Sequence, residues 1–153
     1  MEMLQEASNQ LEENKDLVRR FIEGFWNENR TELAATMLST DYKDHAYTPG
    51  TKDGLIGMSR VLLAAFPDQQ SSIQSIVGDG DRVVARLVLR GTHQGTFRGV
   101  EPTGLSVEVN LYREYRLEQG LIAEHWALFD TAALLSQIGG TLNQQTVCQI
   151  KRG

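Results

Sequence analysis

The stretch Ala123-Glu124-His125-Trp126-Ala127-Leu128-Phe129-Asp130 decides the fold, because it is the last predicted strand before the last predicted helix. Side chains alternate across a strand, so one face is expected to carry Leu121, Ala123, His125, Ala127 and Phe129. A histidine in the middle of an apolar face costs free energy unless it has a partner or a ligand. His125 is therefore expected either in a hydrogen-bonded core network or on the wall of a pocket.

Three earlier segments, 72–77, 82–93 and 105–117, have strand patterns and are separated by Gly-bearing turns and connections. Alternation in the second of them places on one face Val83, Ala85, Leu87, Leu89, Gly91 and His93. In the third, one face carries Leu105, Val107, Val109, Leu111, Arg113 and Tyr115. With the opening stretch, these segments predict a four-stranded antiparallel meander.

The first half of the chain has helical periodicity instead. Apolar residues recur at spacings of three and four from Asn14, a predicted N-cap, and they are Leu17, Val18, Phe21, Ile22, Phe25 and Trp26. A short helix is predicted through 33–38 and a third at 54–66, and 41–46 is expected to be extended. Asp130 is a predicted N-cap for a last helix that ends at Gly139-Gly140. The order predicts an α+β domain with helices on one side of the sheet.

Length and composition predict one domain, 14–139, with an N-terminal extension at 1–13 and a C-terminal tail at 140–153. The extension is helix-permissive and is expected either to lengthen the first helix or to fray. The net charge of -5, without a basic cluster, argues against nucleic-acid binding. The acidic start and the absence of long apolar runs argue against a signal peptide and a membrane span. With Cys148 as the single cysteine, no intrachain disulfide can form, and a cytoplasmic location is expected.

The three histidines, His45, His93 and His125, are the candidate proton-transfer groups, since imidazole titrates near neutral pH. The alternative is that each is a packed, hydrogen-bonded core residue. Their spacing does not predict a metal site. Asp130 could cap the last helix or orient His125, and Arg113 needs an anionic partner, either Glu101 or a ligand oxygen. A pair between Asp44 and the adjacent His45 is disfavoured because neighbours on a strand face opposite ways.

Five motifs in this order resemble the SnoaL-like polyketide cyclases of the nuclear-transport-factor-2-like (NTF2-like) superfamily: residues 14–21, Phe66-Pro67-Asp68, residues 91–97, Pro102-Thr103-Gly104 and Glu124-His125-Trp126. The resemblance implies an NTF2-like cone, in which N-terminal helices pack on a strongly curved antiparallel sheet around an apolar pocket. It also implies a homodimer joined by the sheet, and ring closure without metal or cofactor. Where the family has its catalytic aspartate this chain has Ala127, a family histidine falls near Arg113, and Asp130 matches a second family acid.

These patterns support two main hypotheses of function. The first is a SnoaL-like cyclase, or a related enzyme, that transfers protons on a small hydrophobic carbonyl compound without a cofactor. His125 or His93 would be its base, Asp130 would assist, and Arg113 would stabilise an enolate oxygen. The alternative, favoured by Ala127, is a non-catalytic ligand-binding or dimerisation module. A third reading is a hydrolase or isomerase that uses a carboxylate elsewhere.

The expected substrate-binding residues are Phe25, Trp26, His45, Arg113, Tyr115 and Trp126. We expect an apolar cavity lined by His93, Arg113, His125 and Phe25, because these residues share the predicted inner face. We also expect a homodimer through the open face of the sheet, with Arg86 and Arg90 in or beside the interface.

Overall fold

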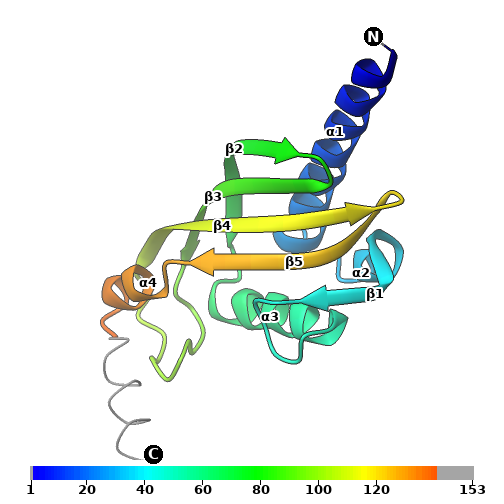
Figure 1. Ribbon diagram of the computed structural model, residues 1–153. Coiled ribbons are helices and arrows are strands. Elements are labelled where there is room, and N and C mark those ends of the chain that lie inside the picture. The colour runs from blue at the N-terminus through cyan, green and yellow to red at the C-terminus, as the bar shows by residue number, and fades with distance from the viewer. Residues whose placement is uncertain (1, 141–153) are drawn as a thin grey trace, which may run out of the picture.

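The computed structural model describes residues 2–140, so Cys148 and nearly all of the predicted tail lie outside the described residues. Its elements (Figure 1) are α1 (Glu2–Phe21), the π-helix η1 (Ile22–Asn27), α2 (Leu33–Met37), β1 (Leu38–Asp44), α3 (Lys52–Ala65), β2 (Gln70–Asp79), β3 (Arg82–Thr92), β4 (Ser106–Glu118), β5 (Leu121–Phe129) and α4 (Thr131–Gln137). None of the helices in this part of the chain combines the length and the hydropathy that crossing a membrane requires.

The five strands form one curved sheet in the order β1-β5-β4-β3-β2 (Figure 1). Strands β2 to β5 form the predicted antiparallel meander, and the alternation of buried and exposed residues along β3 and β4 is as predicted. The α+β class is confirmed. The prediction of a purely antiparallel sheet is wrong at one edge. The segment expected to be extended is a full strand, β1, and it pairs with β5 in parallel.

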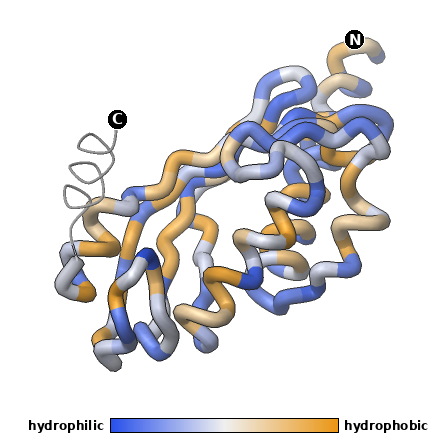
Figure 2. The backbone as a smooth tube through the Cα atoms, turned by 90° about the horizontal axis from the view of Figure 1, so that it is seen from below, coloured by the Kyte–Doolittle hydropathy of each residue, from blue (hydrophilic) through white to orange (hydrophobic). Residues whose placement is uncertain are grey.

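A β-bulge near the start of β5 changes which residues face the core. Leu117 pairs with Ile122 while Arg116 pairs with Glu124, so Ala123 is the extra residue. Ile122 is therefore buried and Leu121 is not, which corrects the prediction that Leu121 shares a face with His125. Bulges increase the local twist of a sheet, and Figure 2 shows the bent strands from below, with hydrophobic stretches along them.

Helix α1 begins at Glu2, so the predicted N-cap at Asn14 is wrong. Residues 2–13 are rich in Glu, Gln, Leu and Met, which favour helix, and the helix runs through them without a break. Asn14 lies inside the helix, buried, and its side-chain oxygen accepts a hydrogen bond from Gln10 at 3.0 Å. Of the two expected states of the extension, the structure has the lengthened helix.

The last turn of the first predicted helix is a π-helix, which the sequence pattern did not indicate. Its wider turn closes with the Glu28 N–H donating to the Glu23 carbonyl at 3.0 Å. Phe25 stacks on Phe21 with ring centroids 4.8 Å apart, and Trp26 meets the edge of Phe25 at 5.0 Å. π-turns are frequent at functional sites, and this one places Trp26 under β4.

The other end of the domain follows the sequence prediction closely. The Asp130 side chain accepts a hydrogen bond from the Ala133 N–H at 3.1 Å, so Asp130 is the N-cap of α4. Gly139 follows the helix with φ +86°, a conformation that favours glycine at this position. Helix α4 therefore starts directly where β5 ends, beside the beginning of β4.

Candidate functional site

His125 on β5 lies in the core, and each of its ring nitrogens has a charged partner. Its Nδ1 is 3.1 Å from an oxygen of Asp44 on β1, and its Nε2 is 3.2 Å from Nη1 of Arg113 on β4. Strand pairing creates this contact, because β5 is the middle strand between β1 and β4. Of the two expectations for His125, the structure has the hydrogen-bonded core network.

The Asp44 carboxylate is fully engaged although it is buried. One oxygen accepts hydrogen bonds from the backbone N–H groups of Ala46 and Tyr47, at 2.8 and 2.9 Å. The other accepts from the Tyr42 hydroxyl at 2.6 Å and from His125. Burial acts to raise the pKa of Asp44, but the hydrogen bonds from His125, Tyr42 and Ala46 outweigh it and hold the pKa below its ordinary value. Asp44 is therefore an anion in the core.

The hydrogen-bond pattern determines the tautomer of His125. A guanidinium can only donate, so Nε2 must accept from Arg113, and the ring proton lies on Nδ1 and is donated to Asp44. Burial lowers the pKa of His125 to about 4, with Arg113 acting in the same direction and Asp44 against it. His125 is thus a neutral bridge between an anion and a cation.

Arg113 is fully buried and lies between the network and an aromatic surface. Its guanidinium carbon is 3.7 Å from the centre of the Trp26 ring, and Nη1 also donates to the Tyr47 hydroxyl at 3.0 Å. Trp26 donates in turn to the hydroxyl of Tyr115, 3.3 Å away. The expected partner Glu101 is exposed, so the anion that balances Arg113 is Asp44, through His125.

A cleft lies on the other side of Tyr47, between α3, β5 and the loop after β3. We call it the α3 cleft; two overlapping hollows of about 620 and 220 Å³ share as lining residues Tyr47, Met58, Val61, Arg98, Phe129 and Thr131. Leu62 and Phe97 line the smaller hollow, and Ala127 lines the larger. No Asp, Glu or His is among the described residues that line either hollow. Tyr47 is the residue that connects the cleft with the charged network.

The expected cavity lined by His93, Arg113, His125 and Phe25 is wrong. Each of these side chains is at most 1% exposed to a water-sized probe, so the space between them is filled. His93 is also far from Arg113, because Ala85 pairs with Arg113 and His93 lies eight residues further along β3. At about 3.3 Å per residue, that separation is about 26 Å along the strand.

His93 is held by the loop that follows β3. Its Nδ1 accepts a hydrogen bond from the Thr103 N–H at 3.2 Å and lies 3.0 Å from the Thr103 hydroxyl, while its ring packs against Phe66. The proton is then on Nε2, which is buried and has no hydrogen-bond partner among residues 2–140. His93 fastens the loop to the sheet and does not join the network around His125.

Two predicted substrate-binding residues, His45 and Trp126, lie on the outer side of the sheet. The Trp126 ring stacks on His45 at 4.7 Å, and Arg82 lies over it at 4.9 Å. His45 pairs with Glu124 at 3.0 Å, and Glu124 also binds Arg116. Since His125 points inward, its neighbours Glu124 and Trp126 must point outward. His45 and Trp126 therefore do not join the buried network around His125.

The other predicted site residues lie beside the network or at the start of α4. Phe25, Trp26 and Tyr115 are buried beside the network, where they pack against its members and do not line the cleft. Asp130 caps α4, and the acid that orients His125 is Asp44, so the second role considered for Asp130 is wrong. Within residues 2–140, no group of three or more His, Cys, Asp or Glu side chains could hold a metal ion.

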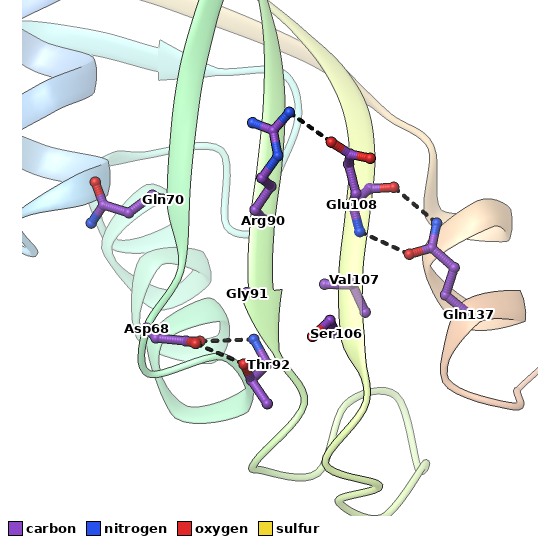
Figure 3. Close-up of a pocket in the computed structure, with 9 residues that line it drawn as sticks. All are labelled: Asp68, Gln70, Arg90, Gly91, Thr92, Ser106, Val107, Glu108 and Gln137. Carbon is purple, nitrogen blue, oxygen red and sulfur yellow. Dashed lines mark hydrogen bonds and ion pairs between the residues drawn. The ribbon is translucent and has the colours of Figure 1, made fainter.

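Another hollow, of about 530 Å³, lies at the other end of the sheet, over β3 and β4 (Figure 3). Its polar groups bind one another: Asp68 accepts from the backbone N–H and hydroxyl of Thr92, and Arg90 pairs with Glu108 at 2.6 Å. The Gln137 side chain bonds to the backbone N–H and carbonyl of Glu108, which lies beyond the end of β5. These contacts join strand ends and helix α4, so the hollow is structural.

Sequence reasoning missed Asp44 and Tyr47. The signal for Asp44 is the strand alternation, which places Tyr42 and Asp44 on one face of β1. The parallel pairing of β1 with β5, which brings Asp44 to His125, has no local signal. Tyr47 lies in a connection that begins with the turn formed on Asp44, and that turn positions its backbone.

Comparisons with known proteins agree on one family. The model of the SnoaL-like polyketide cyclases matches residues 16–138. AclR, a candidate hydroxylase from Streptomyces galilaeus, is 31% identical, with 84% of this chain and 97% of that chain covered and a TM-score of 0.76. IdmH, a candidate polyketide cyclase from Streptomyces antibioticus, is 32% identical, with 82% and 98% covered and a TM-score of 0.73. No curated protein matches this chain.

Proposed function

This chain belongs to the SnoaL-like polyketide cyclase family, and we propose that it is a cofactor-free enzyme acting on a small hydrophobic carbonyl compound of the polyketide type. The chemistry is enolate formation, as in an intramolecular aldol ring closure. The α3 cleft would hold the apolar part of the substrate, and the positive charge of Arg113 behind its wall would stabilise the oxygen on which negative charge develops.

The observation that carries this proposal is the buried chain Asp44–His125–Arg113 beside an apolar cleft. Burying an ion pair costs desolvation free energy, and apolar residues of similar volume are often as stable or more so. A fold that only needed a packed core would not require charges here. Perturbed ionisable groups next to a cleft are typical of catalytic sites, where fixed charges act on a developing charge.

One observation favours the alternative, a non-catalytic ligand-binding module. No carboxylate or imidazole is among the described residues that line the α3 cleft, and Ala127 stands on its wall where the family has its catalytic acid. Arg113 is the cross-strand partner of Ala127, so the cation of the network lies directly behind that position. The two functions differ in whether a bound ketone exchanges its α hydrogens.

Deuterium exchange into 2-tetralone, a bicyclic aromatic ketone, separates the two functions. In D2O the wild-type protein should accelerate loss of the α hydrogens, followed by proton NMR, above the rate in protein-free buffer. Arg113→Met should reduce the acceleration by about tenfold or more, because the cation behind the cleft is lost. Arg30→Met, an exposed arginine between η1 and α2, is the matched control and should keep wild-type activity. Saturable binding of 2-tetralone with exchange at the buffer rate would favour the binding module.

We further propose a homodimer through the outer face of the sheet, with Arg86 and Arg90 in or beside the interface. Leu128 is 73% exposed on this face, and its cross-strand partner Tyr112 is 46% exposed. Light scattering at micromolar concentration should give twice the mass of one chain, and Leu128→Lys should give one chain mass, since it places a charge in the apolar patch. A monomeric wild-type protein would contradict this proposal.

A further inference from the structure

We infer that Tyr47 is the catalytic hydrogen-bond donor of the site, whose hydroxyl binds the carbonyl oxygen of an apolar, enolisable ketone in the α3 cleft. Arg113 polarises that hydroxyl, and His125 with Asp44 are positioning residues. This inference rests on the proposed function and assigns a role in that reaction to each of these residues.

Tyr47 is held at both ends by the network. Its backbone N–H donates to Asp44 at 2.9 Å, and its hydroxyl oxygen accepts from Arg113 at 3.0 Å. Its ring centre is 6.3 Å from that of Trp26 and 5.9 Å from that of His125. The position of the hydroxyl is therefore set by the same residues that bury the charges. Among the residues of the network within 2–140, Ala46 lines the larger hollow and joins the network only through its backbone, whereas Tyr47 lines both hollows and joins it through its side chain.

The direction of the Tyr47 hydroxyl proton follows from the chemistry of Arg113. A guanidinium has no lone pair to offer, so the Tyr47 oxygen is the acceptor in this bond and its own proton must point elsewhere. Within residues 2–140 the structure gives that proton no acceptor. A tyrosine hydroxyl that accepts from a cation becomes a stronger donor to its next partner, because hydrogen bonds in a chain polarise one another. The partner that fits is an oxygen of a molecule in the cleft.

His125 cannot act as the base in this arrangement. Its ring is fully buried, and its only lone pair, on Nε2, is occupied by Arg113. What that lone pair does is hold the guanidinium: with Asp44 behind it, the neutral ring fixes Nη1 at a point from which it also reaches Tyr47. The sequence pattern therefore pointed to His125, a residue that positions Arg113. The residue that contacts the substrate is Tyr47.

The residues of the cleft define the ligand class. The smaller hollow has mainly apolar walls, which suit an apolar, ring-sized ligand: Met58, Val61, Leu62, Phe97 and Phe129. Its polar lining residues are Tyr47, Arg98 and Thr131, and of these Tyr47 is the one that accepts a hydrogen bond from Arg113. In the reaction the α carbon–hydrogen bond breaks and the proton passes to solvent water. The electron pair forms the carbon–carbon double bond, and the carbonyl oxygen takes the negative charge. The Tyr47 hydroxyl stabilises that oxygen by a hydrogen bond. In the reverse step the enolate carbon takes a proton or deuteron from solvent, and the carbonyl forms again with the same hydrogen bond.

The test is α-hydrogen exchange of 2-tetralone in D2O with wild-type protein and Tyr47→Phe. We expect kcat to fall by about a hundredfold, as for loss of one oxyanion donor, while KM changes by less than about threefold because the ring remains. Tyr112→Phe, an exposed tyrosine on the outer face, is the matched control and should keep wild-type kcat. His125→Gln retains an acceptor for Arg113 and should lose less activity than His125→Leu; the reverse order would contradict its positioning role.

Two results would overturn the inference, and a third would overturn the proposed function beneath it. Equal kcat for wild type and folded Tyr47→Phe shows that the hydroxyl is not used. If Tyr47→Phe does not fold, 3-fluorotyrosine at position 47 keeps the shape and makes the donor more acidic. It should change kcat and the pH profile of exchange, and an unchanged profile overturns the role of Tyr47. Wild-type protein without exchange activity contradicts the enzyme itself.

Discussion

Asp44→Ala should lower the free energy of unfolding by about 4 kcal/mol, the size expected when one partner of a buried charge pair is removed. The carboxylate accepts four hydrogen bonds, from the Tyr42 hydroxyl, the His125 ring and the backbone N–H groups of Ala46 and Tyr47. All four donors would lose their acceptor. Arg113 would remain buried without an anion to balance its charge. Urea denaturation at pH 7 measures the effect.

Asp41→Ala is the matched control, because Asp41 lies on the same strand with its side chain exposed. It should change the free energy of unfolding by no more than about 0.5 kcal/mol. An Asp44→Ala protein within about 1 kcal/mol of wild type would show that the Asp44 carboxylate is not the anion that holds the network together.

The stability of the protein should also depend strongly on pH through His125. The folded state holds the pKa of His125 at about 4, below its ordinary value of 6.5. Between these values the unfolded chain binds a proton that the folded chain does not, so stability falls as pH falls. The contribution of His125 is complete above about pH 6.5 and is lost as the pH falls through about 4. Over pH 7 to 4 it amounts to about 3 kcal/mol.

His125→Gln isolates this contribution, because glutamine does not titrate and still offers an acceptor to Arg113. Urea denaturation of both proteins across pH 7 to 4 gives the difference in free energy of unfolding at each pH. As the pH falls from 7 to 4, the wild type should lose about 3 kcal/mol more of its free energy of unfolding than His125→Gln does. A difference that is constant with pH would mean that folding does not change the proton affinity of His125.

The inner faces of β3, β4 and β5 could be predicted because strand alternation is a local property. It placed Arg113 and His125 on one inner face, where the structure brings them to 3.2 Å. The same rule misplaced Leu121, since one bulge at Ala123 reverses the parity before it. Alternation also says nothing about distance along a strand, so it does not show that about 26 Å of strand separates His93 from the residue that pairs with Arg113.

The residues that complete the site could not be found in this way. Asp44 meets His125 only because β1 joins the far side of β5 in parallel, a pairing between residues 81 positions apart. Tyr47 is placed by a turn that forms on the Asp44 carboxylate, so its position depends on that same pairing. Trp26 reaches Arg113 from a π-helix, whose altered periodicity the regular helical pattern does not predict.

The tautomer and charge of His125 test the Asp44–His125–Arg113 network most directly. Two-bond proton–nitrogen correlation spectra of the imidazole rings, with the His125 signals assigned by their loss in His125→Gln, report both. A neutral ring with its proton on Nδ1 is expected from pH 7 down to about 5, because Nε2 must accept from Arg113 while Nδ1 donates to Asp44. A protonated ring at pH 7, or a neutral ring with its proton on Nε2, would contradict the network, since Arg113 could then donate no hydrogen bond to His125.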